Sequence, residues 1–179
     1  EKELSKFCDI RLKVKSFLPF ILYFLVALFV LRGVLASSGT IGLFHDWFIG
    51  PFPEMIMKYS YDGLQLYDVN LGNKEYPSDW LFRISLFPFS FLGGEVVSKG
   101  MLIFFLTLTG VSMFYLGKTL LKLDYCWSLI VGLIYTFSPI VYTRAVAGHI
   151  YYLIGYSLMP LLLTIFHKAQ QTKEKRIQY

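Results

Sequence analysis

The stretch MLIFFLTLTGVSMFYLG, residues 101–117, decides the fold class of this chain. It contains no charged residue, and Lys99 and Lys118 flank it on either side. An α-helix rises 1.5 Å per residue, so about 20 residues of this composition cross the hydrocarbon core of a bilayer. The sequence therefore predicts a membrane-spanning helix at this position.

Three further apolar runs have similar length, at residues 17–36, 125–143 and 149–166. Arg32 lies near the end of the first run, and Pro139 and Pro160 lie inside the last two. Membrane helices tolerate such prolines when neighbouring groups satisfy the freed backbone carbonyls. We therefore expect an all-α polytopic membrane protein with about four transmembrane helices and a long external first loop.

Composition supports this class and excludes others. Of the 179 residues, 55% are hydrophobic and 16% are charged, whereas about 25% charged is usual in soluble domains. The same values exclude an intrinsically disordered chain. The formal net charge is +5, but the basic residues cluster between apolar runs, so we expect membrane lipids as partners and no nucleic acid.

The basic clusters predict the topology. Most of the 17 lysines and arginines lie in residues 1–16, in the link after residue 117, and in residues 167–179. Four spans place these segments on one side, which the positive-inside rule makes cytoplasmic. We expect both termini in the cytoplasm and the protein in the cell membrane. The alternative, a signal peptide cleaved near Ala36, is disfavoured by the length of the apolar run and by Arg32.

The opposite side receives the segment 37–100, which holds more than half of the 12 acidic residues. Within it, Pro53 marks the start of a short helix expected over residues 53–66. Residues 80–92 are apolar and aromatic but too short to span a bilayer. We expect them to form a hairpin or a helix in the membrane interface, where Trp and Phe concentrate.

The tripeptide His45-Asp46-Trp47 follows the first expected span by about ten residues. Asp46 could act as a general base or help to hold a divalent cation, and His45 could act as acid, base or phosphate partner. Trp47 could stack on a sugar ring. The structural alternative is an interfacial anchor in which Asp46 caps a short helix, and these residues alone leave both interpretations open.

Arg144 and His149 lie near the external ends of the last two expected spans. A charge at that depth is costly unless it reaches the interface or has a partner. Arg144 could bind a lipid phosphate with two hydrogen bonds, or pair with an acid such as Asp46 or Glu54. His149 could cap a helix or contact the same phosphate. Arg32 falls near the same face, as expected for a phosphate site or for interfacial arginines in general.

Two separated stretches resemble a known family. They comprise Gly42, His45-Asp46-Trp47 and Pro51 to Pro53, and then Tyr135-Thr136-Phe137-Ser138-Pro139, Arg144, Gly148-His149 and Leu158-Met159-Pro160-Leu161. Together they resemble the amino-terminal part of YfhO-like and 6-pyruvoyl-tetrahydropterin synthase-related membrane proteins, which are similar to the GT-C superfamily of glycosyltransferases. The resemblance implies sugar transfer from a polyprenyl- or dolichyl-phosphate donor on the external face. Asp46 would be the catalytic carboxylate of the site, and His45, Trp47, Arg144 and His149 would bind substrate.

GT-C proteins usually have eight or more spans, so the resemblance also implies further transmembrane helices from a longer chain or a partner subunit. The alternative function is a non-catalytic membrane subunit or scaffold, in which small residues permit close helix contact. A transporter is disfavoured because the apolar runs carry only Ser, Thr and Tyr at mid-depth. The sequence indicates no metal-ligand set, and cofactors remain open apart from the divalent cation that Asp46 could help to hold.

Overall fold

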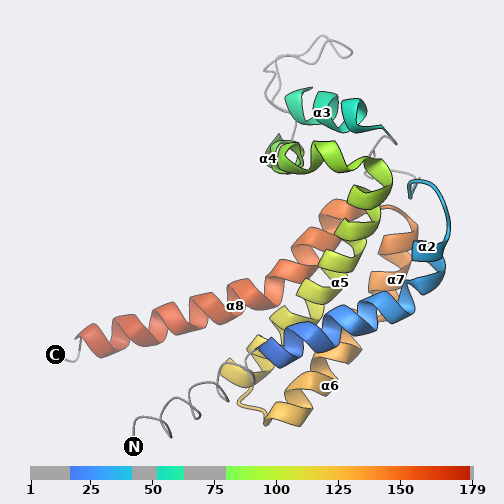
Figure 1. Ribbon diagram of the computed structural model, residues 1–179. Coiled ribbons are helices and arrows are strands. Elements are labelled where there is room, and N and C mark those ends of the chain that lie inside the picture. The colour runs from blue at the N-terminus through green and yellow to red at the C-terminus, as the bar shows by residue number, and fades with distance from the viewer. Residues whose placement is uncertain (1–16, 42–51, 63–79, 178–179) are drawn as a thin grey trace, which may run out of the picture. The chain divides into compact units, whose positions relative to one another are not determined.

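The structure is a computed structural model that describes residues 17–41, 52–62 and 80–177 (Figure 1). Within these ranges every regular element is a helix and no strand occurs. Three helical segments are long and apolar enough to cross a membrane, at Gly94–Thr119, Tyr125–Val146 and Ile150–Thr172. The prediction of an all-α membrane protein is therefore confirmed.

The helical segments extend beyond the predicted apolar runs. Helix α5, Gly94–Thr119, has 26 residues and begins before the expected start at residue 101. The next segment is divided into α6, Tyr125–Thr136, and α7, Pro139–Val146. Helix α8, Ile150–Ile177, continues well past residue 166, so the expected basic tail is helical through Ile177.

The first apolar run differs from the other three. It forms a shorter apolar helix, Phe17–Val30, followed by a turn at Leu31 and by α2, Arg32–Ala36. The described chain thus has three helices of spanning length where about four were expected. Arg32 begins the second piece, where its guanidinium donates to Phe29 O at 3.1 Å and lies 4.4 Å from the Phe29 ring centroid.

The chain divides into two compact units. The membrane unit comprises Glu1–Arg32 and Ile103–Tyr179, and the loop unit comprises Gly33–Leu102. Helices α2 and α5 each contribute residues to both units. The two units are described in turn.

In the membrane unit, the helix Phe17–Val30 packs through one face. Pro19, Tyr23 and Ala27 are buried and follow one another at four-residue intervals, which places them on one side of the helix. A Cβ atom at Gly110 or at Gly132 would overlap the Tyr23 side chain, so these glycines of α5 and α6 form the notch that the ring fills. The notch uses small residues for close helix contact inside the chain.

Tyr23 is also fixed at its polar end. Its hydroxyl donates to Leu129 O of α6 at 3.0 Å, and the side chain is 2% exposed. A buried tyrosine hydroxyl usually finds such a partner because an unpaired one is costly. The contact fixes the rotation of the first helix against α6.

The loop unit contains α3, Pro53–Asp62, α4, Trp80–Ser85, and the 3₁₀-helix η1, Phe87–Leu92. Ile56, Leu86 and Val97 form its core, with Phe82 and Met101 packed against them. Val97 and Met101 belong to the first turns of α5, so the short helices are built on that end of a membrane helix. Residues 80–92 are helical, which decides between the two conformations expected for them.

Candidate functional site

The turn between α7 and α8 holds both predicted phosphate-binding residues that the structure describes. Gly148 has φ +78°, a left-handed conformation that residues with a side chain rarely adopt, and it reverses the chain there. His149 N–H donates to Arg144 O at 3.0 Å across this turn. The backbone thereby brings the two side chains together.

Arg144 and His149 are in contact. Arg144 Nη1 lies 3.1 Å from His149 Nδ1, and because a guanidinium only donates, Nδ1 is the acceptor. The arginine is exposed, while the histidine is partly buried. The pair combines a permanent cation with an imidazole, both of which are groups that bind phosphate oxygens.

The predicted alternative for Arg144 was a partner carboxylate. Within the membrane unit, Asp124 is the acidic residue whose side chain the structure describes, and it caps α6 by accepting from Trp127 N–H at 2.9 Å. Of the two named carboxylates, Asp46 lies outside the described residues and Glu54 belongs to the loop unit. Within its own unit, Arg144 lies over Tyr152, with Cζ 5.3 Å from the ring centroid. An aromatic face attracts the guanidinium without neutralising its charge, so the cation stays available to an anion.

The aromatic contact extends away from Arg144 along α8. Tyr152 stacks on Tyr156 at 6.0 Å between ring centroids, and Tyr156 stacks on Tyr135 of α6 at 4.1 Å with ring planes 9° apart. Arg144 therefore lies at one end of a column of three tyrosine rings. The sequence gathers these tyrosines around the last two spans, but the stacking of their rings was not predicted.

The column ends in a reciprocal pair of hydrogen bonds, which we call the tyrosine clasp (Tyr135 and Tyr156). Pro139 has no N–H for the carbonyl four residues earlier, which is Tyr135 O, and Pro160 leaves Tyr156 O in the same position. Tyr156 OH donates to Tyr135 O at 3.2 Å, and Tyr135 OH donates to Tyr156 O at 3.1 Å. Each tyrosine satisfies the carbonyl that a proline freed on the other helix, as tolerance of prolines in membrane helices requires.

Ser138 completes the clasp. Its hydroxyl lies 3.2 Å from Tyr156 OH. Because the Tyr156 hydroxyl already donates to Tyr135 O, Ser138 is the donor in this contact. The sequence signal for the clasp is a Tyr-x-x-x-Pro spacing that occurs at Tyr135–Pro139 and again at Tyr156–Pro160. Tyr135, Ser138, Pro139 and Pro160 also belong to the stretch that carries the family resemblance, so this stretch has a structural role within the chain.

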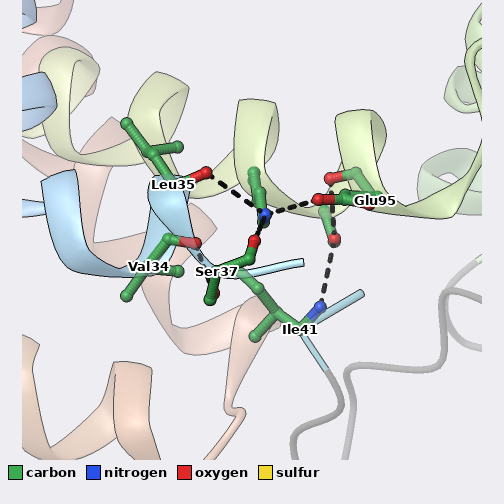
Figure 2. Close-up of polar contacts among 7 residues, drawn as sticks. Val34, Leu35, Ser37, Ile41 and Glu95 are labelled. Atoms are coloured by element: carbon green, nitrogen blue, oxygen red, sulfur yellow. Dashed lines mark hydrogen bonds and ion pairs between the residues drawn. The ribbon is translucent and has the colours of Figure 1, made fainter. Parts of the chain in front are cut away.

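A second polar cluster, the lysine clamp (Lys99 and Glu95), lies in the loop unit (Figure 2). Lys99 is 7% exposed, and its ammonium donates to Glu95 Oε1 at 2.6 Å, to Ser37 O, and to Leu35 O at 3.5 Å. Beside it, Ile41 N–H donates to Ser98 Oγ at 3.4 Å. The first turns of α5 thus fasten the chain that leaves α2.

The lysine clamp was not predicted as a functional feature, because Lys99 was interpreted only as a flank of a span. Its i, i+4 spacing from Glu95 is the one local signal for the ion pair. The fastened chain ends at Ile41, and the segment with His45, Asp46 and Trp47 follows in the sequence. These three predicted residues lie outside the described residues.

The loop unit also contains a surface hollow. Glu54, Met57, Lys58, Tyr61 and Phe87 line an open hollow of about 340 Å³ in the loop unit. Among the residues that the structure describes, no group of three His, Cys, Asp or Glu side chains could hold a metal ion. Comparison with known proteins adds no assignment: no family model, curated protein or solved structure matches the chain.

Proposed function

We propose that this membrane protein is the amino-terminal part of a GT-C-like glycosyltransferase. It transfers a sugar from a polyprenyl- or dolichyl-phosphate donor, and the reaction takes place on the external face of the cell membrane. In this proposal both termini are cytoplasmic, and the remaining transmembrane helices belong to a longer chain or a partner subunit.

The observation that supports the proposal is the contact between Arg144 and His149 at the end of a membrane helix. The guanidinium lies 3.1 Å from the imidazole, is exposed, and lies over an aromatic ring. A lipid-linked donor presents its phosphate near the membrane surface, and a cation there stabilises the charge that forms as the phosphate leaves. Arg144 is suited to this role because its planar guanidinium can bind two phosphate oxygens.

Asp46 supplies the catalytic carboxylate in the proposal. It accepts a proton from the acceptor hydroxyl as the oxygen attacks the anomeric carbon, and the bond from that carbon to the phosphate oxygen breaks. His45 and Trp47 contact the substrate beside it, and a divalent cation held with the help of Asp46 would offset the phosphate charge.

The test compares Arg144 with a matched arginine. Membranes containing the full protein are given a radiolabelled polyprenyl-phosphate sugar, and transfer is measured for Arg144→Ala, Arg144→Lys, Arg32→Ala and Asp46→Asn. Removing a group that stabilises the developing charge typically lowers the rate about 100- to 1,000-fold. We expect this loss for Arg144→Ala and Asp46→Asn, partial retention for Arg144→Lys, and no loss for Arg32→Ala, whose guanidinium binds its own helix.

Equal activity of Arg144→Ala and Arg32→Ala would overturn the role of Arg144, and full activity of Asp46→Asn would remove Asp46 from the mechanism. Absence of transfer by the unmodified protein would favour the non-catalytic subunit. Gly110 and Gly132 contact Tyr23 of the same chain and Gly117 lies against Ser128, whereas a Cβ placed at Gly155 would have nothing within 4 Å. Gly155 is therefore the small residue that supports that alternative.

A further inference from the structure

The 3₁₀-helix η1 exposes apolar side chains in an unusual arrangement. Its sequence FPFSFL has no charged residue, and none of its six residues is buried. Phe91 is 74% exposed, the highest value among the large hydrophobic residues of the described chain, and Phe89 is 51% exposed. The core of the loop unit takes Leu86 from just before η1 and leaves η1 itself outside.

The periodicity of η1 shows which faces are open. A 3₁₀-helix has three residues per turn, so residues three apart share a face. Phe89 and Leu92 lie on one exposed face, and Pro88 and Phe91 lie on a second. The third face carries Phe87, which is 57% exposed, and Ser90, which is partly covered. Each face of η1 therefore leaves at least one apolar side chain uncovered within the described chain.

The exposed faces of η1 lie next to helix α5 in the chain. Gly93 is the single residue between η1 and α5, which is long and apolar enough to cross a membrane. Each residue advances the chain by at most about 3.6 Å, so Phe91 lies within about 11 Å of the first residue of α5. On α5 itself, Val96 and Gly100 are exposed on one face and continue the apolar surface toward the span.

The length of α5 and the positions of its charges together indicate where it leaves the membrane. Its 26 residues extend about 39 Å, which exceeds the hydrocarbon thickness of about 30 Å. Its charge-free run, residues 101–117, suits the hydrocarbon, so the first turns, with Glu95 and Lys99, are expected at the level of the head groups. Phenylalanine side chains at that level partition into the bilayer boundary.

We propose that η1 is a membrane-inserting segment, in which Phe89, Phe91 and Leu92 enter the boundary between head groups and acyl chains on the side where α5 begins. The lipid surface is the partner of this face. The segment holds the loop unit against the bilayer, and this inference is independent of sugar transfer.

The test measures the depth of single labelled cysteines in lipid nanodiscs. Cys8 and Cys126 are replaced by Ser, and a bimane fluorophore is attached to Phe91→Cys or Phe89→Cys of the full chain. Two positions calibrate the scale: Phe104→Cys, which is 55% exposed on α5, and Lys122→Cys in the link between α5 and α6. The discs contain phosphatidylcholine with a nitroxide either near the head group or deep in the acyl chain, and iodide is the aqueous quencher.

We expect the labels at residues 89 and 91 to be quenched more by the shallow nitroxide than by the deep one, with emission shifted to shorter wavelength than at residue 122. The label at residue 104 should show the opposite nitroxide order, and the label at residue 122 should respond mainly to iodide. Quenching of residue 91 by iodide alone would overturn the inference in favour of an aqueous segment. Protection of residue 91 from both nitroxides and from iodide would overturn it in favour of a covering protein partner.

Discussion

The tyrosine clasp and the lysine clamp solve the same problem with different chemistry. In both, side chains from one part of the sequence satisfy backbone carbonyls of another, 21 residues away in the clasp and 62 to 64 residues away in the clamp. The clasp uses two neutral hydroxyls within membrane-spanning segments. The clamp uses a charged ammonium at the beginning of α5, with a carboxylate beside it that is 46% exposed.

The difference follows from the cost of charge in hydrocarbon. A buried ammonium is costly in an apolar medium, whereas a hydroxyl requires only that its hydrogen bonds be made. Neutral donors are therefore suited to the proline sites inside the membrane helices. A lysine can act at the end of α5, where its ammonium meets three oxygens and where the carboxylate reaches solvent. The type of donor therefore matches the surroundings of the carbonyl: hydroxyls inside the apolar segments and an ammonium at the end of α5.

The largest expected effect comes from removing the clamp's ammonium. Lys99→Ala removes the ammonium that donates to Leu35 O, Ser37 O and the Glu95 carboxylate. Hydrogen bonds that involve a charged group contribute about 1.5–3 kcal/mol, and we expect a loss of that size. The measurement is the free energy of unfolding in mixed micelles of mild detergent and sodium dodecyl sulfate. Lys99→Met, which keeps the aliphatic stem, serves as the control. Wild-type stability of Lys99→Met would show that the stem, and not the hydrogen bonds, stabilises this region.

A smaller effect is expected from the clasp. Tyr135→Phe and Tyr156→Phe each remove one hydroxyl while keeping the stacked rings, and hydrogen bonds inside membrane proteins average about 0.6 kcal/mol. We expect the double variant to lose about 1 kcal/mol of unfolding free energy in the same micelle titration. Tyr142→Phe, on a residue that is 71% exposed, is the matched control and should leave stability unchanged. A loss equal to that of Lys99→Ala would contradict the comparison between the two clusters.

The sequence predicted the fold class because that class depends on a local property. Long runs without charge identify membrane helices regardless of their neighbours, and the run at residues 101–117 lies inside α5. The first run, residues 17–36, was harder to predict because its helix is interrupted at Leu31, before Arg32. No periodicity in the apolar pattern marks that interruption.

The candidate site was predictable only where its contacts are local. Arg144 and His149 are five residues apart with Gly148 between them, so their proximity could be inferred from a turn. Lys99 was not recognised, because Leu35 and Ser37 are more than 60 residues away and only the tertiary structure brings them to it. Each proline indicates a carbonyl without its helical N–H. That Tyr135 and Tyr156 donate to these carbonyls could not be predicted, because it depends on how α6 is rotated against α8.

The carbonyl left without its N–H by Pro160 provides a sharper test of the clasp. Pro160→Ala restores an N–H that can donate to Tyr156 O within α8. The carbonyl then no longer depends on the hydroxyl of Tyr135 for a hydrogen bond. Tyr135→Phe should then cost less in the Pro160→Ala background than in the wild type. A double-mutant cycle on the unfolding free energy should give a coupling of about 0.5 kcal/mol. Additive effects would mean that Tyr135 OH does not act through the carbonyl that Pro160 leaves free.

The smallest expected effect concerns the exposed partner of the clamp. Glu95→Gln keeps an oxygen that can accept from Lys99 but removes the charge, and ion pairs with an exposed partner contribute little to stability. We expect a loss of unfolding free energy smaller than that of the Tyr135→Phe, Tyr156→Phe double variant, reduced further at 1 M salt because salt screens exposed charges. Lys99→Ala should lose little of its effect in the same salt, since the carbonyls of Leu35 and Ser37 are held by hydrogen bonds that salt does not remove. Equal destabilisation by Glu95→Gln and Lys99→Ala at both salt concentrations would mean that the clamp depends on the ion pair. The clamp would then not stabilise the chain by satisfying backbone carbonyls, as the clasp does.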